Sequence, residues 1–129
     1  MKKVLTVGVF DYLHIGHIKL FDRCKSYGDY LIVAVQDSDY VEKFKPGTKL
    51  LYSTEERLYM VKSIKYVDEV IVYKSVDDIV KEVDYDVFIT GPDQIHDGFK
   101  KAIQYSKENG KDTIVLARTE GISSTALRR

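Results

Sequence analysis

Two histidines, His14 and His17, stand three residues apart, directly after the first apolar stretch of the chain. If a strand over residues 4–9 leads through a loop into a helix beginning near Gly16, both imidazoles lie at the start of that helix. A helix start presents unpaired backbone N–H groups and the positive end of the helix dipole, so it favours an anion. Two imidazole donors there favour a polyphosphate. Residues 8–17 therefore predict a nucleoside triphosphate site.

The same residues argue against other roles for the two histidines. Zinc is disfavoured because the Glu of H-E-x-x-H is missing, and the remaining ligand candidates, His96 and Cys24, fall in other predicted elements. A surface or core role without function is disfavoured by the surrounding strand, turn, glycine and helix. Neither a G-x-x-x-x-G-K-[ST] nor a G-x-G-x-x-G pattern follows the first strand. This argues against a P-loop phosphotransferase and a dinucleotide-dependent oxidoreductase.

Length and composition limit the class of protein. The 129 residues suit one domain, 1–129. Lys plus Arg and Asp plus Glu number 20 each, so no overall field attracts nucleic acid or an anionic membrane. The single cysteine cannot form an internal disulfide, no signal peptide is recognisable, and no apolar run approaches the ~20 residues of a membrane span. We expect a cytoplasmic protein without nucleic-acid or membrane partners.

Strand and helix signals alternate along the chain. Five short apolar runs predict strands over residues 4–9, 30–35, 70–73, 85–89 and 113–116. The runs are nearly continuous in apolar character, as expected of parallel strands covered on both faces. The alternation predicts an α/β fold, a doubly wound Rossmann-like five-stranded parallel sheet in the order 3-2-1-4-5. The switch point then lies between the first and fourth strands, where residues 8–17, residues 91–93 and the loop after the fifth strand converge.

Local signals define the expected helices. Ser53 and Glu56 form the S-x-x-E pattern of a capping box, so a helix is expected from there to about residue 66. A short helix is expected over residues 75–83, and Gly28 should terminate a helix over residues 16–27. The basic segment 37–52 has no clean period and is expected to be a mobile loop. Two buried helix faces are expected, formed by Ile18, Leu20, Phe21 and Cys24 and by Ile95, Phe99, Ala102 and Ile103.

Three motifs resemble a known family. They are the F-D-x-x-H-x-G-H core within residues 8–17, the K-Y-V-D-E-V stretch at 65–70 and the R-T-E-G-I-S-S-T stretch at 118–125. In order and spacing they resemble the small nucleotidyltransferases of the cytidylyltransferase superfamily, above all its glycerol-3-phosphate branch. The resemblance covers the chain from Met1 to its carboxyl end. It implies transfer of a cytidylyl group from CTP to a small alcohol phosphate, with Mg²⁺ bound to the triphosphate and a homodimeric protein.

The resemblance also implies roles for individual residues. Catalytic contacts to the phosphates are implied for His14, His17 and Arg118. Nucleotide binding is implied for Gly8, Val9, Phe10, Asp11, Gly16, Asp93, Arg118, Thr119, Gly121, Ile122, Ser123 and Ser124. Contacts to the acceptor or to phosphate are implied for Asp37, Lys43, Lys45, Lys49, Arg57 and Lys65. Residues 123–125 are expected to open a final helical turn.

Physical chemistry supports this division of roles. The second pKa of a phosphomonoester is about 6, so the acceptor is largely ionised at neutral pH and attacks without a protein base. The protein must then align the attacking oxygen, the α-phosphorus and the leaving pyrophosphate, and supply donors and positive charge for the transition state. Simpler alternatives remain: a solvated turn for the lysines, a surface position for Arg57, a helix cap for Asp93, and a pocket-rim position for His96.

Departures from the family pattern leave the acceptor open. Val9 replaces a threonine, Lys65 replaces an arginine, and residues 91–96 replace a G-D-D-W pattern. Ser38 stands where relatives carry an acid, and Asp37 or Asp39 is the substitute. A polyol or amino-alcohol phosphate other than glycerol phosphate is therefore considered. An adenylyltransferase of the same superfamily and a non-catalytic nucleotide-binding module are the alternative functions.

Overall fold

Five parallel strands form one sheet in the order β3-β2-β1-β4-β5. The computed structural model describes residues 1–117, and its strands are β1 Lys3–Gly8, β2 Tyr30–Gln36, β3 Glu69–Tyr73, β4 Val87–Thr90 and β5 Asp112–Val115. The predicted fold class and strand order are confirmed, and strand bounds differ from the prediction by one or two residues. The switch point lies between β1 and β4, because the chain continues from β1 to one side and from β4 to the other.

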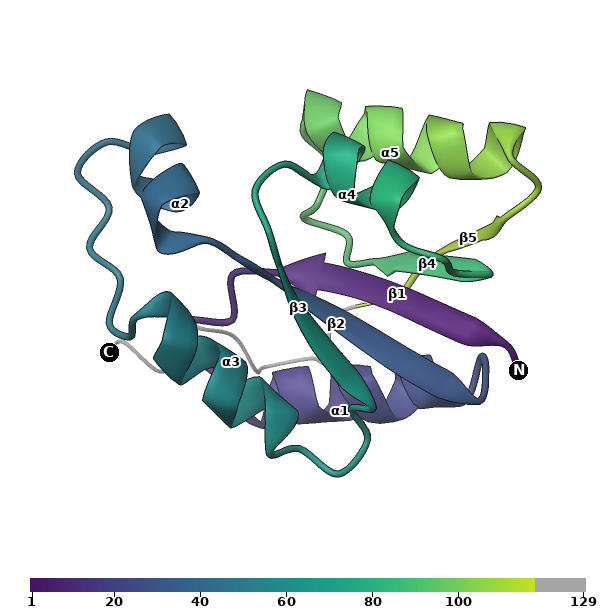
Figure 1. Ribbon diagram of the computed structural model, residues 1–129, viewed down its shortest axis with the longest axis horizontal. Coiled ribbons are helices and arrows are strands. Elements are labelled where there is room, and N and C mark those ends of the chain that lie inside the picture. Colours follow the sequence, from purple (N-terminus) through teal and green to yellow (C-terminus); the bar gives the residue numbers. More distant parts are fainter. Residues whose placement is uncertain (118–129) are drawn as a thin grey trace.

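Helices cover both faces of the sheet. They are α1 Ile15–Lys25, α2 Ser38–Phe44, α3 Thr54–Lys62, α4 Val76–Glu82 and α5 Asp97–Glu108. Figure 1 shows α1 and α3 on one face, α4 and α5 on the other, and α2 beyond the carboxyl end of the sheet. Side chains of β1 alternate between these layers, Leu5 toward the α4 and α5 core and Val4 toward the α1 and α3 core. Burial on both faces explains the continuous apolar runs.

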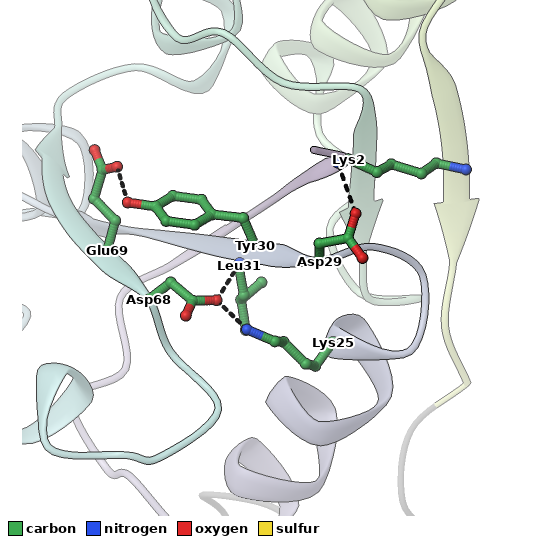
Figure 2. Close-up of polar contacts among 7 residues, drawn as sticks. All are labelled: Lys2, Lys25, Asp29, Tyr30, Leu31, Asp68 and Glu69. Carbon is green, nitrogen blue, oxygen red and sulfur yellow. Dashed lines mark hydrogen bonds and ion pairs between the residues drawn. The ribbon is translucent and has the colours of Figure 1, made fainter.

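Carboxylates satisfy backbone groups at the amino end of the sheet (Figure 2). Asp68 accepts hydrogen bonds from the Leu31 N–H at 2.8 Å and from the Lys25 ammonium. Asp29 accepts the Lys2 N–H at 3.0 Å. The hydrogen bonds from Lys25 and Leu31 lower the pKa of Asp68 although burial opposes them. These contacts hold strand starts together at the end of the sheet away from the switch point.

The capping box predicted for the third helix is confirmed. The Ser53 hydroxyl accepts the Glu56 N–H at 3.1 Å, and the Glu56 carboxylate accepts the Ser53 N–H at 3.0 Å. The helix α3 that follows ends at Lys62, earlier than residue 66. No helix within residues 1–117 is long and apolar enough to cross a membrane.

Several local predictions were wrong. Residues 38–44 form helix α2, which is too short to show a period and is anchored by buried Val41. Ile18 is 38% exposed and Ile95 is 66% exposed, so neither belongs to a buried helix face. Helix α1 ends at Lys25 rather than at residue 27, so Gly28 is not its terminator. Gly28 serves packing instead, because a Cβ there would lie 2.6 Å from the Lys2 carbonyl oxygen.

Candidate active site

A cavity of about 600 Å³ opens beyond the carboxyl ends of β1 and β4. Its walls come from residues 7–12, the first turns of α1, residues 45–50, residues 91–94 and the segment after β5. This is the switch point, where an open parallel sheet binds its ligand. Of the residues implied by the resemblance, the cavity is lined by Gly8, Val9, Phe10, Asp11, His14, Gly16, His17, Lys45, Lys49 and Asp93.

The two histidines form the cap of helix α1. Nδ1 of His14 accepts the Gly16 N–H at 3.0 Å, and Nδ1 of His17 accepts the His14 N–H at 3.2 Å. The rings stack with centroids 4.1 Å apart. A ring nitrogen that accepts a hydrogen bond carries no proton, so the proton of each neutral ring is on Nε2. The pair thus acts as a capping box, and within residues 1–117 the two Nε2–H donors have no protein partner.

Burial keeps both imidazoles neutral. Desolvation, together with a smaller electrostatic effect of the neighbouring His14, lowers the pKa of His17 to about 4. Desolvation also lowers the pKa of His14. At neutral pH both rings therefore lack a positive charge. In the protein without ligand, each ring can therefore donate a hydrogen bond to an anion as a neutral imidazole.

The neutral state of His17 predicts a pH-dependent stability. The unfolded chain protonates His17 below the ordinary pKa of 6.5, whereas the folded protein does so only below about 4. Between these values the unfolded state binds more protons, so the free energy of unfolding should fall as the pH is lowered through this range. Urea unfolding of wild type and His17→Asn across the range isolates this contribution, because other groups titrate in both proteins. Equal pH slopes in the two proteins would contradict a neutral His17.

The Phe10 ring contacts the histidine pair through His17. Its backbone is in the left-handed region with φ 55°, which is unusual for an aromatic residue and occurs where the surroundings hold a strained loop. Its ring packs edge-on against His17, with centroids 5.4 Å apart, and against Phe21 at 5.3 Å. The ring lies over Gly8, where a Cβ would be only 2.7 Å from the Phe10 Cζ. Gly8 and Phe10 therefore shape the wall behind His17.

The Asp11 carboxylate anchors the loop that carries the two lysines lining the cavity, Lys45 and Lys49. The carboxylate accepts the Leu51 N–H at 2.7 Å and the Tyr52 N–H at 2.9 Å, and the residue is buried. Lys45 and Lys49 lie on the part of the same loop that faces the cavity. The Asp11 side chain is thus engaged with protein backbone, and it links the loop after β1 to residues 45–52.

Arg57 is fully buried, with 0% of its surface exposed, although it lies in the first turn of α3. Nη1 donates to the carbonyl oxygens of Val9 at 2.8 Å and Gln36 at 2.7 Å. Its Nε and Nη2 donate to the Tyr52 carbonyl oxygen and to the hydroxyl oxygens of Ser38 and Thr54. These five bonds occupy every donor of the guanidinium. The side chain thus ties separate segments of the chain together, and none of its donors is left over for the implied contact to an acceptor phosphate.

Three further implied residues lie away from the cavity. Lys65 is exposed between α3 and β3, with its ammonium over the Tyr66 ring, 5.1 Å from the centroid. This is the amino end of the sheet, opposite the cavity. Lys43 is exposed on α2, and Asp37 accepts a 3.4 Å hydrogen bond from the Thr54 hydroxyl. None of the three lines the cavity, and neither does the alternative acid Asp39. Ser38 instead contacts Arg57 and Thr54.

The sequence analysis missed some residues of the cavity wall and left the roles of Asp93 and His96 open. Asp93 is not a cap of α5, because His96 caps it by accepting the Gly98 N–H at 3.1 Å, and His96 lies outside the cavity wall. Gln94 and Arg23 line the cavity without having been predicted. The predicted final helical turn and several implied residues lie outside the described residues: Arg118, Thr119, Gly121, Ile122, Ser123 and Ser124.

The site combines features suited to a polyphosphate. Two neutral Nε2–H donors stand at a helix start, and two lysines approach from the loop anchored by Asp11. Helix starts and ammonium groups both attract phosphate. On a doubly wound parallel sheet, such a cavity at the switch point defines a Rossmann-like nucleotide-binding protein.

Comparison with known proteins narrows this class. The model of the Cytidylyltransferase-like family matches residues 5–129. The chain belongs to this family of nucleotidyltransferases. It is 39% identical to a glycerol-3-phosphate cytidylyltransferase of Bacillus subtilis, over 99% of this chain and 95% of that protein.

Two more relatives show the spread of the family. An FAD synthase of Thermococcus sibiricus is 37% identical over 83% of this chain and 74% of that protein. The crystal structure of a lipopolysaccharide core biosynthesis protein from Thermoplasma volcanium superposes with a TM-score of 0.76 at 29% identity. That match covers 92% of this chain and 97% of the other. The relatives that this chain resembles are thus named for different activities.

Proposed function

We propose that this protein transfers a cytidylyl group from CTP to a small alcohol phosphate and releases pyrophosphate. The observation that carries the proposal is the stacked pair of neutral histidines, which caps α1 through Nδ1 and lines the cavity with two Nε2–H donors that have no protein partner within residues 1–117. The 39% identity to a glycerol-3-phosphate cytidylyltransferase over nearly the whole chain supports the choice of CTP and of a polyol phosphate.

The proposed reaction is a single displacement at the α-phosphorus. A phosphate oxygen of the acceptor forms a bond to this phosphorus, the bond to the bridging oxygen breaks, and pyrophosphate leaves with the electron pair. The acceptor is already ionised, so no protein base is needed. His14 and His17 donate to the oxygens on which charge grows, while Lys45 and Lys49 hold phosphate groups in line. Arg118 and the 118–125 segment complete the nucleotide site in this proposal.

Mg²⁺ belongs to the same proposal. This ion is usually held by substrate phosphates, water and one or two carboxylates, and Asp11 and Asp93 are the acidic residues within residues 1–117 that line the cavity. When bound, Mg²⁺ would neutralise charge on the triphosphate. A homodimer is a further proposal, supported by the family resemblance.

The lysines provide a first test with a matched control. Lys49→Gln removes a charge that faces the cavity and is expected to raise KM for a phosphate substrate about tenfold. Lys43→Gln removes the same charge from a side chain outside the cavity wall and is expected to stay within about twofold of wild type. Steady-state pyrophosphate release measures both. Equal effects of the two substitutions would show that only general electrostatics is involved.

A substrate screen tests the whole proposal. Pyrophosphate release is measured with CTP or ATP against glycerol, erythritol, ribitol, glucitol and serinol phosphates, and flavin mononucleotide. Turnover only with CTP and an alcohol phosphate is the expected result. Preference for ATP would instead favour adenylyl transfer, for which the identity to an FAD synthase is the supporting observation. Nucleotide binding without turnover under any pairing would identify a binding module.

A further inference from the structure

Gln94 bridges the two strands that separate at the switch point. The β1 and β4 ladder ends at the pair Thr6 and Ile89. Beyond it, the Gln94 Nε2 donates to the Val7 carbonyl oxygen at 2.8 Å, and its Oε1 accepts the Gly91 N–H at 2.9 Å. The side-chain amide thus continues the hydrogen bonding between the strands for one more step. Both bonds together fix the plane of the amide.

Gln94 lines the cavity that His14 and His17 also line. A primary amide has two N–H donors and a carbonyl oxygen with two lone pairs. Gln94 uses one donor and one lone pair for Gly91 and Val7. Within residues 1–117, its second N–H and its second lone pair have no protein partner. The cavity wall therefore carries one donor and one acceptor in a fixed orientation.

A donor and an acceptor side by side on Gln94 discriminate between the phosphate groups and the hydroxyl groups of a nucleotide and an alcohol phosphate. An ionised phosphate oxygen only accepts hydrogen bonds, so the carbonyl oxygen of Gln94 repels it. An alcohol hydroxyl both donates and accepts, and it can satisfy the two remaining sites of the amide together. Gln94 is half-buried, so water can satisfy its amide until a substrate covers it. A bound substrate that covers the amide without pairing these two groups costs free energy, so a substrate lacking that hydroxyl binds less well.

We propose that Gln94 hydrogen-bonds a substrate hydroxyl group and makes the enzyme specific for substrates that carry it. The proposal rests on the cytidylyl transfer proposed above and adds a specificity-determining residue to it. Hydroxyl groups are present on the ribose of the nucleotide and on the acceptor. The two sources share the same chemistry and are separated by experiment.

The experiment combines removal of the amide with removal of single hydroxyls. Gln94→Met keeps the side-chain length but has no amide. Gln104→Met is the matched control, because Gln104 is an exposed residue of α5 whose amide contacts Glu108 outside this cavity. For wild type and both variants, kcat/KM is measured with CTP, 2′-deoxy-CTP and 3′-deoxy-CTP. A second series compares sn-glycerol 3-phosphate with propane-1,2-diol 1-phosphate and propane-1,3-diol phosphate.

For wild type and Gln104→Met, kcat/KM with one of the deoxy substrates is expected to be about five- to tenfold lower than with its parent substrate. Gln94→Met should use that substrate and its parent equally well. The hydroxyl concerned identifies the ribose or the acceptor as the source. If Gln94 only bridges the strands, Gln94→Met lowers kcat/KM by one common factor for every substrate, which overturns the proposal.

Two results with wild type test the inference even if Gln94→Met is inactive. If wild type turns over all deoxy substrates within about twofold of their parents, the hydroxyl contact is absent whatever the variants do. If wild type releases no pyrophosphate from CTP with any acceptor of the screen, the proposed function fails, and with it the inference. Turnover without hydroxyl discrimination overturns the inference alone.

Discussion

Replacing His17 with asparagine is expected to lower kcat for pyrophosphate release by about a hundredfold or more in a protein that stays folded. The Oδ1 of asparagine can accept the His14 N–H in place of Nδ1, which keeps the cap of α1. It has no group at the position of Nε2–H. The transition state therefore loses one donor while the helix start is preserved. The same reasoning applies to His14→Asn, because asparagine is also a strong N-cap.

The alanine variants separate capping from catalysis. His14→Ala and His17→Ala remove both the accepting and the donating nitrogen, so they should lose as much kcat as the asparagine variants. The cap of α1 is lost as well, and His14→Ala should be about 1 kcal/mol less stable than His14→Asn. Steady-state kinetics and urea unfolding measure the two effects independently. Near-normal kcat in any folded variant would remove that histidine from the mechanism.

The fold and the position of the cavity were predictable because they depend on patterns that are local in sequence. The apolar runs identify strands that are buried on both faces, and alternation with helices restricts the topology to a few choices. The switch point then follows from the strand order. The histidines were recognisable because their spacing and the adjacent strand are both short-range features. Helix α2 was missed because its 7 residues, about two turns, are too few to show a helical period of apolar residues.

The roles of Arg57, Asp11 and Gln94 were not predictable in the same way. Their partners are mostly backbone carbonyl or N–H groups from segments far apart in the chain. Every residue except proline carries the same two backbone groups, so no sequence pattern marks such a partner. An arginine in the first turn of a helix has the pattern of a surface residue. Only the converging segments of the fold show that this one is buried.

Arg57→Ala is expected to reduce the free energy of unfolding by about 3–5 kcal/mol. The carbonyl oxygens of Val9 and Gln36 lose their donor in the interior, and the nearby carboxylates of Asp11 and Asp37 lose a compensating charge. Arg57→Lys keeps the charge but not the planar fork, so an intermediate loss is expected. Lys62→Ala on the exposed side of the same helix is the control, with a change within about 0.5 kcal/mol. Urea unfolding measures all three.

Kinetics of Arg57→Lys distinguish a positioning role from a phosphate contact. If Arg57 positions the loops that carry Val9 and Tyr52, the folded variant loses kcat through misplaced donors, and saturating acceptor does not restore it. A residue that binds the acceptor phosphate would instead raise KM, and high acceptor concentration would restore turnover. A variant as stable as wild type with KM for the acceptor raised about tenfold would show that the guanidinium contacts substrate. Since its donors are all engaged with protein, the loss is expected in stability and kcat.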